Sequence, residues 1–175
     1  DPGGVARELG NTVNQITNAA VDFQQRRINH QYNSAKLKSQ VGLYELANSF
    51  DQDEDYETMV DRYDEAARQI VGEHSNTISG AREKAAYLQE QELVLAQGRE
   101  AIKDKAWGVE TDFKRAELTE YMTKARELVI NGQGIQTIEN VSAMIDSMKE
   151  ANYLSEEAGV KALETFKQDS SIAWI

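Results

Sequence analysis

Hydrophobic residues recur at three- and four-residue steps along most of the chain, a spacing that places them on one face of an α-helix. The longest such segment, Ile78 to Ile130, contains no proline and is rich in good helix formers. Its apolar stripe consists of Ala81, Ala85, Leu88, Leu95, Ile102, Ala106, Val109, Phe113, Ala116, Tyr121, Ala125 and Leu128 or Val129. Glu92 and Arg99 interrupt the stripe, which favours a long helix packed on partners over a two-stranded coiled coil. Gly98 and Gly108 each weaken this helix by about 1 kcal/mol and are candidate kinks.

A second long helix is predicted from Val5 to Phe50, where four- and three-residue steps alternate without a break. Its stripe is apolar at both ends and polar in the middle, at Arg27, His30 and Ser34. The polar residues can face water or fix the register of a bundle, or they can belong to a ligand site. Amide side chains flank the stripe and can lie against neighbouring subunits or face solvent. The candidate interface on this helix comprises Leu9, Val13, Ile16, Phe23, Arg27, His30, Leu37, Val41 and Tyr44.

The remaining elements are shorter. The acidic run 51–55 is expected to cap a helix over 54–71, because carboxylates accept the free N–H groups of a helix start. Its D-x-D-x-D spacing also suggests a calcium loop, but Tyr56 and Arg62 stand where Gly and Glu are required. Asn131 to Gly134 ends the long helix, and Ser155 caps the second helix of a C-terminal hairpin.

These elements predict an all-α fold, an elongated helical bundle in which the two long helices run antiparallel with the shorter helix and the hairpin alongside. We expect a rod or bundle over residues 1–131 and the packed hairpin over 132–175.

The amino-acid composition excludes several kinds of functional site. With no cysteine, the chain has no disulfide, thiolate metal site or cysteine nucleophile. His30 and His74 lie far apart in the sequence and have no paired carboxylates at ligand spacing, so neither a metal nor a cofactor is expected. No catalytic motif is present, and we expect no enzymatic activity from this segment and no catalytic residue. No stretch reaches the roughly 18 apolar residues of a membrane-spanning helix.

Charge is unevenly distributed. The net charge is −11, but residues 1–50 carry five basic and four acidic side chains. The first helix is therefore the part least repelled by an acidic partner, while the overall charge gives no indication of DNA contact. The chain begins at Asp1 without a methionine and ends on the apolar residues 172–175, which suggests a processed product or a piece of a longer protein.

Three segments resemble a known group of proteins. They are DYETMVDRYDEAARQI, ISGAREKAAYLQEQ and TIENVSAMIDSMKEANYLSEEAGVKALETF, in this order after a long amide-rich helix. The arrangement is similar to helical regions of internal virion proteins of tailed bacteriophages, including ejection proteins and related tail components. Asn152 stands where glycine is usual in the turn before Ser155, and the segment lacks the transglycosylase domain of some larger ejection proteins.

The resemblance implies a non-enzymatic structural subunit located in the virion, which assembles with copies of itself or with other virion proteins and contributes to a genome-delivery conduit. A cellular coiled-coil adaptor or spacer that binds a helical partner is the alternative. A third reading is the helical arm of a larger enzyme.

Overall fold

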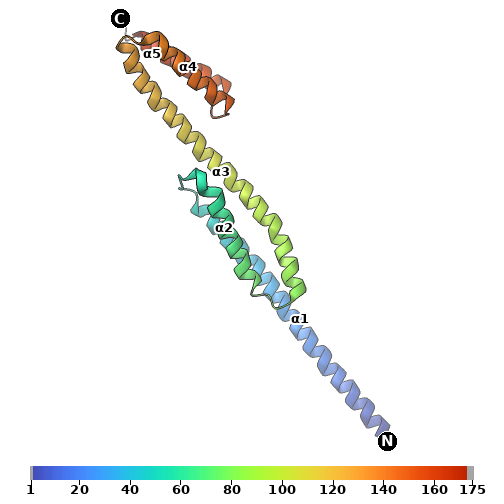
Figure 1. Cartoon of the computed structure of the whole chain (residues 1–175). Coiled ribbons are helices and arrows are strands. Elements are labelled where there is room, and N and C mark those ends of the chain that lie inside the picture. The colour runs from blue at the N-terminus through green and yellow to red at the C-terminus, as the bar shows by residue number, and fades with distance from the viewer. Residues whose placement is uncertain (1, 173–175) are drawn as a thin grey trace. The chain divides into compact units, whose positions relative to one another are not determined.

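A computed structural model describes residues 2–172, with side chains from 3 to 171. Within that range the chain forms five helices and no strand, so the all-α class is confirmed (Figure 1). The helices are α1 (Pro2–Ser49), α2 (Tyr56–Ser75), α3 (Ala81–Ile130), α4 (Gly134–Glu150) and α5 (Glu156–Ile172). The two long helices and the C-terminal helical pair match the sequence prediction. Of the apolar chain end, residues 173–175 lie outside the described residues.

The chain divides into two compact units, which we call the N-terminal unit (Asp1–Ala106) and the C-terminal unit (Trp107–Ile175). α3 contributes residues 81–106 to the first and 107–130 to the second. The sequence placed a division at 131–132, where the chain turns from α3 into α4; that division stays a prediction.

The N-terminal unit is a bundle of α1, α2 and the first half of α3. α2 runs antiparallel to α1, with the rings of Phe50 and Tyr63 6.2 Å apart at one end. α1 and α3 run in the same direction, since Lys36 pairs with Glu90 at 2.9 Å and, further along both helices, Lys105 donates to the Ala47 carbonyl at 3.2 Å. The predicted antiparallel arrangement of the two long helices is therefore wrong here. The reason is that α2 reverses the chain once at each of its ends.

The core of this bundle is a single stripe from each helix. On α1 it includes the small side chains of Ala35 and Ser39. Tyr87 of α3 and Met59 of α2 are fully buried at 0% exposure. The other buried residues are Ile28, Leu43, Phe50, Tyr63, Ala67, Val71, Ser75, Ile78, Gln91, Leu95, Ile102 and Ala106.

The acidic run before α2 caps the helix as expected. The Asp55 carboxylate accepts a hydrogen bond from the Thr58 backbone N–H at 3.3 Å. Asp53 accepts two hydrogen bonds from the Arg62 guanidinium, at 2.6 and 2.9 Å. The guanidinium also lies over the ring of Phe50, 5.3 Å from its centroid. The run therefore starts α2 and ties this start to the end of α1.

The C-terminal unit packs α4 and α5 on the second half of α3. Its core consists of Leu118, Ala125, Val129, Val141, Ile145, Met148 and Phe166. Two residues in the left-handed region turn the chain, Gly132 (φ 94°) and Asn152 (φ 63°). The Ser155 hydroxyl accepts from the Ala158 N–H at 3.1 Å, which confirms the predicted cap of α5.

Candidate assembly interface

The candidate interface predicted from the sequence lies entirely on α1, and every one of its residues is exposed. Phe23 and Tyr44 keep 71% and 69% of their surface in solvent. The seven apolar members are Leu9, Val13, Ile16, Phe23, Leu37, Val41 and Tyr44, each at least 48% exposed. Exposed apolar side chains arranged in a continuous stripe are typical of an interaction surface. We call the nine predicted residues, with Ala20, Ser34 and Asn48 that complete the repeat, the outer stripe.

The outer stripe is not the face that holds the N-terminal unit together. Between residues 28 and 50 the buried side of α1 carries Ala35 and Ser39, both at 0% exposure. A step of two residues turns a helix by about 200°, so Leu37 and Val41 point away from that side. α1 therefore has two opposite apolar faces over this range, of which the chain covers one.

The described residues in the first half of α1 form no buried face. Every side chain from Gly3 to Arg27 is exposed, and Ile28 is the first buried residue. Up to Gln24, the side-chain hydrogen bonds of this segment are local, from Thr12 to the Glu8 carbonyl and from Thr17 to the Val13 carbonyl. Glycine, asparagine and β-branched residues give it low helix propensity. Helices in water depend chiefly on the packing of one face, and residues 3–27 have no buried face within the described chain.

The covered face of α1 includes a polar cluster with α3. The Tyr32 hydroxyl donates to the Glu90 carboxylate, and Lys36 forms an ion pair with the same carboxylate at 2.9 Å. The hydrogen bond from Tyr32, followed by that from Lys36, lowers the pKa of Glu90, and the same contacts raise the pKa values of Tyr32 and Lys36. The cluster fixes the register of α1 against α3 and leaves the outer stripe free.

Part of the amide surface is also used inside the chain. The Gln31 side-chain oxygen accepts from the backbone N–H and the hydroxyl of Ser79, at 3.0 and 2.8 Å. Gln25 donates to Glu83 at 3.2 Å. These contacts dock the start of α3 on the middle of α1.

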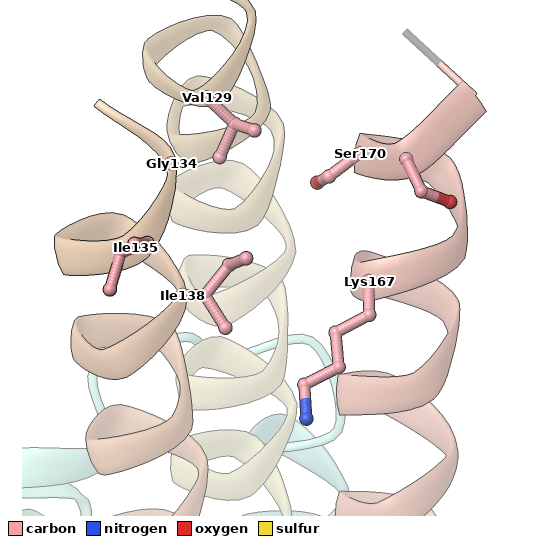
Figure 2. Close-up of a pocket in the computed structure, with 7 residues that line it drawn as sticks. Val129, Gly134, Ile135, Ile138, Lys167 and Ser170 are labelled. Atoms are coloured by element: carbon pink, nitrogen blue, oxygen red, sulfur yellow. The ribbon is translucent and has the colours of Figure 1, made fainter. Parts of the chain in front are cut away.

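The C-terminal unit contains a hollow of about 300 Å³ near the ends of α3, α4 and α5, lined mainly by apolar atoms. Figure 2 shows the Ser170 hydroxyl directed toward Val129, with Ile135 and Ile138 on one side and Lys167 on the other. The Ser170 oxygen is buried without a hydrogen-bond partner among the described residues. Sequence reasoning missed this serine, because nothing in the local pattern distinguishes it from the exposed Ser171.

A second groove of about 430 Å³ lies between α3 and α5. Leu118, Met122 and Leu154 line it, and its charged lining residues are Arg115, Arg126 and Lys161. Arg126 pairs with Asp169 and Arg115 donates to the Tyr153 carbonyl, whereas Lys161 has no partner within the described part of the chain. An apolar floor with basic groups at its edge suits an acidic amphipathic segment.

The described residues include no group of three or more His, Asp or Glu side chains that could hold a metal ion. None of their helices is long and apolar enough to cross a membrane.

Comparison of the chain with protein-family models, curated proteins and solved structures gives no match.

Proposed function

We propose that this chain is a non-enzymatic structural subunit of a bacteriophage virion, an internal or ejection protein. It assembles there with copies of itself or with other virion proteins and contributes to a conduit for genome delivery. The observation that carries the assembly role is the outer stripe of α1, which repeats for about eleven helical turns without a covering partner.

Two further features support this proposal. The two longest helices have 48 and 50 residues. The acidic groups with lowered pKa values, such as Glu90 and Asp53, belong to ion pairs that fix helix positions. The three segments that resemble internal virion proteins support a location in the particle.

The test is peptide mass spectrometry on purified native particles from the source, quantified against the major capsid protein. Peptides of this chain at a fixed stoichiometry across gradient fractions support the proposal. A host protein of similar abundance in the lysate serves as the contamination control. If the peptides fall away with that control during purification, the virion assignment is wrong.

A cellular adaptor is the second candidate, favoured by the basic-edged groove between α3 and α5. This function predicts that a fluorescent acidic amphipathic helical peptide binds the full chain, and that Lys161→Glu weakens the binding. Lys167→Glu is the matched control, since Lys167 lies on the same helix and lines the other hollow. Equal binding by both variants contradicts an adaptor that uses this groove.

A further inference from the structure

We infer that the outer stripe of α1 binds the outer stripe of a second copy of this chain, antiparallel, with the contact centred between Arg27 and His30. The inference rests on the proposed assembly role and names its partner. It follows from the area of the stripe, from the order of large and small residues along it, and from its charges.

The exposed area is that of a stable dimer. Burying an aliphatic or aromatic side chain of this kind removes about 100 Å² from water. The seven apolar residues of the outer stripe therefore offer about 700 Å² per copy, close to the roughly 800 Å² per partner of a standard protein interface. No other apolar surface on the described part of α1 is comparable, because its exposed large apolar residues off the stripe are Val5 and Val21, which lie far apart along the helix.

The spacing of the stripe is self-complementary when one copy is reversed. Going forward from Arg27 the steps are three, four, three, four, and going backward from His30 they are the same. Reversal about this centre therefore brings every stripe residue opposite another: Arg27 to His30, Phe23 to Ser34, Ala20 to Leu37, Ile16 to Val41, Val13 to Tyr44 and Leu9 to Asn48 of the second copy.

This register also matches residue sizes. Phe23 meets the small Ser34, and Leu37 meets Ala20, so the layers have similar volumes and can pack without large voids. A parallel, in-register pair would place Phe23 against Phe23 and Ala20 against Ala20, which crowds one layer and leaves a cavity in the next.

Charge favours the same orientation. A parallel pair places Arg27 directly against Arg27 of the second copy, and like charges at facing positions repel. The antiparallel pair places Arg27 opposite His30 instead of opposite a second Arg27. Beside the seam, Lys38 lies near Thr17 and Arg26 near Asn33 of the second copy, so no like charges face each other there.

The first experiment measures the mass of the full chain in solution by sedimentation equilibrium over a concentration series. We expect a monomer–dimer equilibrium, which Ile16→Glu weakens on the order of a hundredfold in Kd because it places a carboxylate in a buried layer. Val21→Glu is the matched control, an exposed apolar residue on α1 that lies off the stripe. Both residues are exposed in the single chain, so both variants should retain the N-terminal bundle, as checked by thermal unfolding.

The second experiment determines the relative orientation of the two copies by disulfide cross-linking. The chain has no native cysteine, so introduced cysteines are its only thiols. We expect mild oxidation to give a disulfide-linked dimer of the double variant Val13→Cys, Tyr44→Cys, but not of either single variant. An internal disulfide is impossible, since 31 residues of helix separate the two sites by about 47 Å.

Dimers of each single variant would overturn the antiparallel orientation. A chain that is monomeric at all concentrations would overturn the inference, and so would equal weakening by Ile16→Glu and Val21→Glu. None of these three results removes the proposed function, because another virion protein could then cover the stripe. The mass spectrometry of purified particles tests that function separately.

Discussion

Gly98 of α3 lies directly against the phenol oxygen of Tyr63 of α2. A Cβ at Gly98 would overlap that oxygen, and Tyr63 is only 2% exposed, so its ring has little room to move. Burial raises the pKa of this phenol, with a smaller contribution from the Asp64 charge. The glycine predicted as a possible kink is thus a point of close helix approach, and α3 continues through it without a break.

We expect Gly98→Ala to lower the free energy of unfolding by about 1–3 kcal/mol, because overpacking outweighs the gain in helix propensity. Urea denaturation followed by circular dichroism measures the change. Gly108→Ala is the control, since Gly108 lies in the same helix and a Cβ there meets nothing within 4 Å. The free energy of unfolding of that variant should rise by about 0.5–1 kcal/mol. Stabilisation by both substitutions would mean that the Tyr63 contact is absent.

The hydroxyls of Ser39 and Tyr87 form a hydrogen bond in the core of the N-terminal unit, where both residues are fully buried. Ser39→Ala leaves the Tyr87 hydroxyl with the Val71 carbonyl at 3.5 Å as its remaining acceptor. We expect a loss of about 1–3 kcal/mol, the cost of a poorly satisfied buried hydroxyl. Tyr87→Phe should then lower the free energy of unfolding less in the Ser39→Ala background than in the wild type. Strictly additive losses in this double-mutant cycle would contradict a coupled pair.

The Asp53–Arg62 contact predicts a pH dependence. The hydrogen bond from the Arg62 guanidinium lowers the pKa of the Asp53 carboxyl in the folded chain. The contribution of this contact to the free energy of unfolding is therefore complete above about pH 5, where unfolded aspartate is ionised. It is lost as the pH falls through the lowered pKa of Asp53. Asp53→Asn should make the fall in Tm between pH 5 and pH 3 shallower than in the wild type.

Asp61→Asn serves as the matched control for that experiment, because Asp61 is exposed on α2 and has no partner among the described residues. Its Tm profile should follow the wild type. If the two variants give the same slope, the Asp53–Arg62 pair does not account for the acid sensitivity.

Ser170 gives a prediction for the C-terminal unit. Its buried hydroxyl has no partner within the described residues, so Ser170→Ala removes a desolvated polar group and should raise stability by about 1 kcal/mol. The Ser171 hydroxyl is exposed and donates to the Gln168 carbonyl at 2.8 Å, and Ser171→Ala should change stability by less than about 0.5 kcal/mol. Thermal unfolding compares the two, and destabilisation by Ser170→Ala would indicate a partner for this hydroxyl.

Local signals in the sequence predicted the helices well. Where a helix begins or ends depends on residues within a few positions, such as Asp55, whose carboxylate caps α2, and Gly132, whose backbone adopts a positive φ after α3. The relative direction of the two long helices was not predicted correctly. Whether α1 and α3 run parallel depends on α2 spanning the full length of the bundle between them, which no periodicity within either long helix records.

The buried faces were predicted only in part. On α3 the pattern identified Leu95, Ile102 and Ala106 correctly but included Leu88 and Phe113, which are exposed. On α1 the outer stripe gave the stronger signal because the inner face carries Ala35, Ser39 and Gly42. At Gly42 the helix α2 approaches closely, to the extent that a Cβ there would lie 3.1 Å from Ile70. Hydrophobic periodicity measures side-chain size and polarity, so it underestimates a face whose function is close approach.

The parallel direction of α1 and α3 also has a mechanical consequence. Ile28 of α1 lies beside Gly80 at one end of the N-terminal bundle, and Lys105 of α3 pairs with Asp51 at the other. A pulling force applied to Ile28 and Ala106 therefore acts along the helix axes and loads the layers of the core together, in shear. An antiparallel pair would present both attachment points at one end and could be peeled apart layer by layer. This topology therefore lowers the rate of unfolding under force, and it does so without requiring a higher equilibrium stability.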